Sequence, residues 1–343
     1  GANGNDGAQG IQGLTGATGL TGATGLAGTN GIDGASVVAG AINDLSDAGS
    51  DGTSIYLGTL GASDDGGNYN SALGYSALIN NVSGYTNVAV GSLSLTSNTL
   101  GISNIAVGAN TLMLGVSADY NVAIGQSALR ANTGIANVAV GHLSSNKNTT
   151  GTYNTSVGAY SLRNNTTGYF NTAFGGLVME LNTTGVENVA MGYDALSNNT
   201  TSGFNVAIGS RALLSGGGSS NTVVGSYALT SNSSGANNAV LGSDALRNTS
   251  NGSNNVALGF SAGRSSNGTG NIFLGNQAGE FAGNVSNQLF IDNSSTSSPL
   301  IGGDFSTDEL NLNAKVNIRD AMHINPRATA PAGGVKGDLY MDT

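Results

Sequence analysis

The sequence predicts an all-β protein built as a parallel β-solenoid of about thirteen coils, and three observations support this prediction. An Asn, three mostly small or β-branched residues and a Gly recur thirteen times between Asn70 and Gly275. Successive repeats start 16 or 17 residues apart, and a period this short is typical of a solenoid. Each period holds two apolar runs that are too short for helices and are separated by Gly and Asn. We therefore expect each period to form one two-stranded coil.

The first apolar run supplies the strand that defines each coil. Strand alternation puts the second and fourth residues of the pentapeptide, such as Val88 and Val90, on one face, and we expect them to line the interior. The middle residue, usually Ala as at Ala89, then faces outward. Because a small outward residue permits close approach, this column predicts a contact between chains.

The second apolar run contributes a Leu four residues after the Gly, and we expect this Leu to fill the core. It occurs at Leu78, Leu95, Leu112, Leu129, Leu162, Leu196, Leu213, Leu229 and Leu246, with Met179 in a similar role. The opening Asn of the repeat never varies, and we expect its amides to stack from coil to coil as in cross-β ladders.

The last repeats depart from this pattern. Gly263 and Gly279 replace the core Leu, and Phe273 replaces the small Ala. Since terminal repeats of solenoids are commonly atypical, we expect the roll to end or to change its cross-section here.

The N-terminal segment predicts the number of chains. Gly occupies every third position from Gly1 to Gly34, and a triple helix requires this period because only Gly fits where three chains crowd the axis. We therefore expect a collagen-like triple helix at the N-terminus and a homotrimer.

The strands "NVAVG", "NVAIG" and "NTAFG" resemble the left-handed parallel β-roll of trimeric autotransporter adhesin heads. The resemblance covers residues 70–283, although this chain inserts a polar "NTTG" turn into most coils. A collagen-like shaft followed by a junction, a roll and a neck is also similar to phage tail fibres and bacterial surface fibres. The resemblance implies a left-handed, homotrimeric roll and an adhesive role at a bacterial cell surface or on a virion.

These features divide the chain into five expected parts. They are a collagen-like triple helix at 1–36, a junction with a first coil at 37–69, β-roll repeats at 70–283, a β-rich neck at 284–325 and a connector to a further C-terminal region at 326–343.

Composition argues against several functional classes. The net charge is -10, and no Lys or Arg precedes Arg130, so a basic patch for nucleic acid or for an anionic membrane is not expected. No apolar run is long enough to span a bilayer, so we expect no membrane insertion by this segment. The chain has no Cys, and its two His, His142 and His323, lie far apart, so we expect no enzyme, no cofactor and no metal site. His142 is expected to be an exposed turn residue.

Two groups of residues are candidate ligand sites. Asp44, Asp47 and Asp51 offer oxygen ligands beside Gly, but their spacing matches no calcium loop, and a plain junction is the favoured interpretation. Aromatic residues precede the repeat Asn in several coils and could stack on sugar rings or pad contacts between chains. They are Tyr69, Tyr120, Tyr153, Phe170 and Phe204, with Tyr85 and Tyr169 nearby.

The function predicted from the sequence is that of a non-catalytic structural and adhesive segment of a trimeric extracellular fibre. One alternative is a filament subunit that polymerises end to end. Another is a binding module for cell-surface glycans or a matrix receptor, with the turn aromatics as its contacts.

Overall fold

The computed structural model describes residues 48–50, 55–57 and 69–317. The predicted collagen-like segment, the three junction aspartates, His323 and the C-terminal connector lie outside these residues. The strands are β1 (Ala48–Ser50), β2 (Ile55–Leu57), β3 (Ser71–Leu73), β4 (Val88–Val90), β5 (Ile105–Val107), β6 (Val122–Ile124), β7 (Val138–Val140), β8 (Thr155–Val157), β9 (Thr172–Phe174), β10 (Val189–Met191), β11 (Val206–Ile208), β12 (Thr222–Val224), β13 (Ala239–Leu241), β14 (Val256–Leu258), β15 (Ile272–Leu274), β16 (Gln288–Ile291), β17 (Ile301–Asp304) and β18 (Glu309–Leu312).

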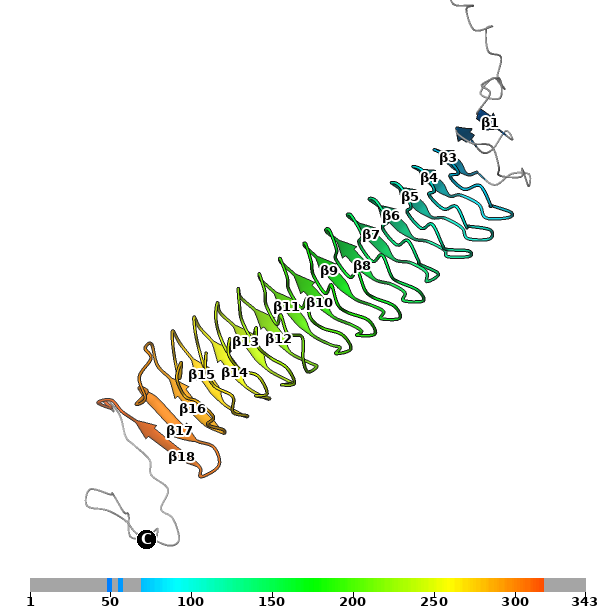
Figure 1. Ribbon diagram of the computed structural model, residues 1–343. Helices are drawn as coiled ribbons and strands as arrows, with labels where there is room; N and C mark the ends of the chain where they lie inside the picture. The colour runs from blue at the N-terminus through cyan, green and yellow to red at the C-terminus, as the bar shows by residue number, and fades with distance from the viewer. Residues whose placement is uncertain (1–47, 51–54, 58–68, 318–343) are drawn as a thin grey trace, which may run out of the picture. The chain divides into compact units, whose positions relative to one another are not determined.

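The strands form one sheet in which each coil adds one strand. Strands β2 to β16 pair in parallel with their sequence neighbours, without a shift in register between repeats. The pairs β1–β2, β16–β17 and β17–β18 are antiparallel. Figure 1 shows β3 to β15 in single file, one strand for each of the thirteen repeats. The predicted all-β parallel solenoid of about thirteen coils is confirmed.

The second apolar run is a chain of turns rather than the strand that the sequence predicts. Its residues two and four positions after the Gly have left-handed backbones, with φ of 53° at both Ser76 and Leu78. Residues other than Gly and Asn rarely adopt this conformation, so nothing in the repeat predicts it. The run still bonds from coil to coil, as when the Leu78 N–H donates to the Ser94 carbonyl at 2.9 Å.

The expected orientation of the first run is wrong. The middle residue faces the interior: Ala89 is fully buried, whereas Val88 and Val90 on either side are only partly buried. Alternation fixes which residues share a face but not which face is the core. The predicted core Leu is confirmed, since Leu78, Leu95 and their equivalents are at most 1% exposed. A small strand residue opposite a Leu therefore fills the regular narrow coils.

The stacked amides predicted for the repeat Asn are confirmed. The backbone N–H of Asn87 donates to Asn70 Oδ1 at 2.8 Å, and Asn87 Nδ2 donates to the Gly101 carbonyl at 2.8 Å. A second buried amide, Asn98, donates to that same carbonyl at 3.1 Å and to Asn81 Oδ1 of the preceding coil at 2.9 Å. In most coils the two ladders thus converge on one backbone carbonyl, such as that of Gly101 here or Ser202 further along, and close the polar turn.

The buried core consists of two apolar clusters separated by a polar layer. One cluster runs from Ala72 to Ala139, and the other from Leu162 to Phe273. Between them the hydroxyl oxygens of Ser144 and Ser145 lie 2.7 and 2.8 Å from Ser156 Oγ.

The atypical last coils keep the parallel ladder and change its filling. Phe273 is fully buried, and a Cβ on Gly263 or Gly279 would lie 2.5 Å from its ring. These two glycines thus make room for the large ring. The cross-section changes as expected, but the parallel ladder continues one strand further, to β16.

Candidate functional site: an apolar sheet face and an aromatic row

The outer side of the sheet is a continuous surface that runs from β3 to β16. The second and fourth residues of each pentapeptide point outward there, and none of them is buried. We call this surface the apolar face. From β3 to β16 it consists of Ser71, Leu73, Val88, Val90, Ile105, Val107, Val122, Ile124, Val138, Val140, Thr155, Val157, Thr172, Phe174, Val189, Met191, Val206, Ile208, Thr222, Val224, Ala239, Leu241, Val256, Leu258, Ile272, Leu274, Leu289 and Ile291.

The register extends the apolar face to the last strand. Leu289 lies opposite Gly303 of β17, which lies opposite Leu310 of β18. Fourteen strands at about 4.8 Å each give the face a length of roughly 60 Å from β3 to β16. Leu310 is 62% exposed and Phe174 is 53% exposed. A patch of this kind is large for a monomer and is typical of an interaction surface.

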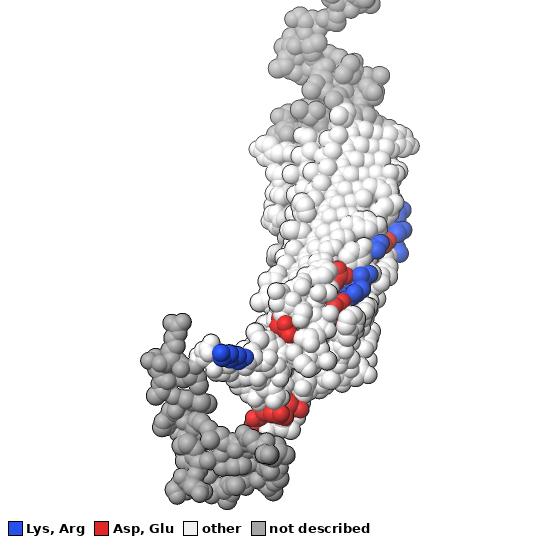
Figure 2. Space-filling view, turned by 90° about the vertical axis from the view of Figure 1, so that its left-hand side faces the viewer, with Lys and Arg blue, Asp and Glu red and all other residues white. Residues whose placement is uncertain are grey.

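No member of the apolar face carries a charge, and the ion pairs of the solenoid lie elsewhere. Arg163 pairs with Glu180 at 3.1 Å, and Arg264 pairs with Glu280 at 3.2 Å. All four of these residues follow the strand-terminal Gly by five positions, in the turn run that packs across the core from the strands. Figure 2 shows a broad surface without charged residues, with the charges gathered toward one side and one end of the solenoid.

Two further ion pairs lie in the same turn runs, where Arg211, Asp194 and Asp244 follow the Gly by two positions and Arg247 follows it by five. Arg211 pairs with Asp194 at 3.5 Å, and Arg247 pairs with Asp244 at 2.8 Å. The ring of Tyr227 lies between the two guanidinium groups, 5.6 Å from that of Arg211 and 4.9 Å from that of Arg247. The turn side of the solenoid is therefore well suited to water, whereas the apolar face is not.

The predicted aromatic residues form an exposed row beside the apolar face. Each one directly precedes the buried repeat Asn and has a left-handed backbone, with φ between 52° at Tyr69 and 61° at Phe204. Their exposed fractions run from 51% at Tyr153 and Phe170 to 66% at Tyr69.

The structure brings only part of the aromatic row together. Tyr153 stacks on Phe170 at 5.2 Å between ring centroids, and Tyr169 meets Phe170 edge to face at 5.4 Å. The other members lie in coils that are not adjacent to one another. His142 is exposed, as predicted, and packs edge to face against Tyr160 at 5.4 Å.

The described residues contain no group of three or more His, Asp or Glu side chains that could hold a metal ion. Within the same ranges, no helix has the length and hydropathy needed to cross a bilayer. Comparisons with protein-family models, with curated proteins and with solved structures returned no match.

Sequence reasoning missed the apolar face because it assigned these residues to the core. A usable signal was present: the second position varies from Ser to Ile and the fourth from Val to Phe, whereas the middle position stays small in most coils. A narrow interior tolerates little variation in volume, so the constant column was the better candidate for the core.

Proposed function

We propose that this chain is a non-catalytic structural and adhesive segment of a homotrimeric extracellular fibre, on a bacterial cell surface or a virion. The observation that carries the proposal is the uncharged apolar face. Three copies that turn these faces toward a common axis would shield them from water and leave the charged turn side outside. Such closed symmetry is the usual way in which identical chains bury identical surfaces.

Two features of the sequence support three chains rather than two. The Gly triplets at the N-terminus fit a triple helix, whose geometry requires three strands. The repeat strands also resemble the left-handed rolls of trimeric adhesin heads. We propose the same handedness and stoichiometry for this chain.

A cross-linking experiment tests which surface joins the chains. The chain has no Cys, so Val206→Cys and Ile208→Cys each introduce one thiol on the apolar face. We expect a short bis-maleimide to give covalent dimers with at least one of these variants, because equivalent residues meet near the axis. Asn198→Cys is the matched control, since Asn198 is exposed on the turn side.

Equal cross-linking in all three variants, or none on the apolar face, would contradict the proposed packing. The cross-linker reports only the contact between chains, so the experiment can be done without knowing the receptor.

A filament that grows end to end is the second candidate. It is favoured by β18, whose outer edge has no partner strand within the described residues. Such an edge is a template for pairing with another chain. Electron microscopy of the purified chain distinguishes the two: a fibre segment gives rods of one length, whereas a filament gives rods that lengthen with protein concentration.

A further inference from the structure

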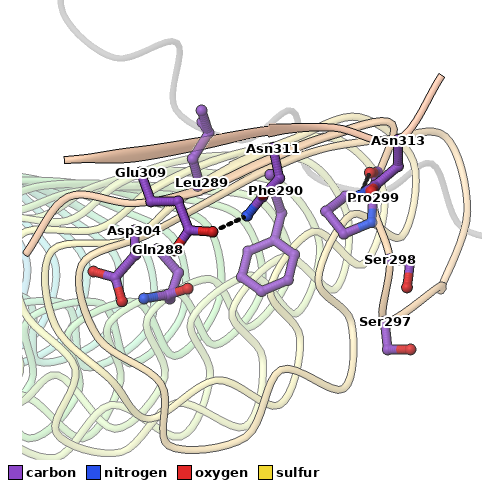
Figure 3. A pocket seen from close by; sticks show the side chains of 12 residues that line it. Gln288, Leu289, Phe290, Ser297, Ser298, Pro299, Asp304, Glu309, Asn311 and Asn313 are labelled. Atoms are coloured by element: carbon purple, nitrogen blue, oxygen red, sulfur yellow. Dashed lines mark hydrogen bonds between the residues drawn. The ribbon is translucent and has the colours of Figure 1, made fainter. Parts of the chain in front are cut away.

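A pocket lies at the C-terminal end of the solenoid, on the side of the sheet opposite the apolar face. Its volume is about 310 Å³, and strands β16, β17 and β18 form its floor. Figure 3 shows Gln288, Asp304 and Glu309 at one end of the pocket in this view and Pro299 with Asn313 at the other. This volume is at the lower end of the range for small-molecule sites.

The pocket exists because the sheet continues beyond the last turn run. In the regular coils the inward residue of the strand is covered by a Leu of the turn run, such as Leu78 or Leu95. Here the inward positions across the three strands are Phe290, Gly302 and Asn311, which lie opposite one another in register. Gly302 is buried, and a Cβ there would lie 3.0 Å from the side chain of Pro299, so the glycine makes room for Pro299, which lines the pocket.

The lining combines one aromatic ring with amide and carboxylate groups. Phe290 is half-buried and stacks on Phe273 at 5.4 Å, so its ring is held in place from below. Asn311 Nδ2 donates to Glu309 Oε1 at 3.1 Å, which orients both polar groups. Hydrogen bonds from Ser306 and then from Gln288 lower the pKa of the Asp304 carboxyl below its ordinary value.

The charge of the lining restricts the ligand. Asp304 and Glu309 are the only charged side chains among the lining residues, and both are acidic. An anionic ligand would meet two carboxylates and no cation. A ligand with many hydroxyl groups and one apolar face fits better, because carboxylate and amide oxygens accept from hydroxyls while the ring packs against C–H groups.

We propose that this pocket binds a neutral pyranose unit of a glycan. Phe290 packs against the face of the sugar ring, and Gln288, Asp304, Glu309 and Asn311 hydrogen bond with its hydroxyls. The pocket opens away from the apolar face, so it stays accessible in the trimer proposed above. Its position gives the adhesive function a site that differs from the aromatic row.

The test uses the full chain on an array of neutral, sulfated and sialylated oligosaccharides, followed by titration with the neutral oligosaccharide that binds best. We expect binding to neutral glycans that persists in a chelator. Glu309→Ala and Asn311→Ala each weaken this binding about tenfold, since each removes a hydrogen bond to a sugar hydroxyl. Both residues are exposed, so these variants keep the fold.

Asn276→Ala is the matched control, because Asn276 is an exposed amide outside the pocket, and it binds as the unaltered chain does. The proposal is overturned by any of four results: no neutral glycan binds, only sulfated or sialylated glycans bind, a chelator abolishes binding, or the two pocket variants bind normally. Light scattering on the same samples reports the trimer separately. A monomer that binds sugar would contradict only the proposed assembly.

Discussion

The coil that carries Ser156 and the coil that carries Phe273 share one backbone ladder but have opposite interiors. Both residues are the fully buried middle residues of their strands, and both strands pair in parallel with each neighbour. Ser156 is matched by two serine hydroxyls, whereas the Phe273 ring is matched by two glycines. The hydrogen-bonded frame, which consists of the backbone ladder and the stacked Asn amides, therefore specifies the coil. The buried side chains, which we call the filling, change together, so that a change at one position is matched at its neighbours.

The largest expected effect concerns the frame. Asn171→Ala removes side-chain hydrogen bonds to Asn154, to Asn188 and to the Gly185 carbonyl, and leaves the buried Asn188 N–H without its acceptor. We expect the free energy of unfolding to fall by about 4 kcal/mol, because buried polar groups left without a hydrogen-bond partner are strongly destabilising. Urea denaturation at a fixed protein concentration measures it.

The matched control for the frame is Asn198→Ala, which truncates an exposed amide and should change the free energy of unfolding by less than about 0.5 kcal/mol. If the two variants had equal stability, the amide ladder would not be what specifies the coil.

The next effect concerns the filling around Phe273. Leu occupies the position of Gly263 in regular coils with φ near that of Gly263, such as 47° at Leu246 against 59° at Gly263, so the backbone accepts Leu. Gly263→Leu alone should lower the free energy of unfolding by at least about 2 kcal/mol, because the new side chain collides with the Phe273 ring. Phe273→Ala alone should cost about 3 kcal/mol by leaving a cavity.

Combining the two substitutions sharpens the comparison. Gly263→Leu with Phe273→Ala restores the regular filling, and we expect the double variant to be more stable than either single one. Additive losses in a double-mutant cycle would show that the glycine and the ring do not compensate each other.

The smallest effect concerns the charged turn side. Arg163→Ala should lower the free energy of unfolding by less than about 1 kcal/mol, because its pair with Glu180 is partly exposed and screened by solvent. Repeating the denaturation at high salt should narrow the difference further. A larger loss of unfolding free energy would show that the ion pairs also help to specify the coil.

The period, the core Leu and the stacked Asn amides were predictable because each recurs at a fixed spacing, as from Leu78 to Leu95. The direction of the strand faces was not, since alternation treats Ala89 and Val90 symmetrically until the width of the coil is known. The left-handed turns were missed because Leu78 and its equivalents carry a backbone that normally marks Gly. The C-terminal pocket was not predictable, because it depends on the register of β16 to β18 and on Gly302, which lie outside the repeats.

We propose that the apolar face joins three chains, and the molar mass in solution tests this assembly most directly. Multi-angle light scattering should give three times the 33.8 kDa of one chain. Ile208→Asp, which buries a charge in the proposed interface, should shift the mass to that of one chain. A mass of 33.8 kDa for the unaltered protein would contradict the account.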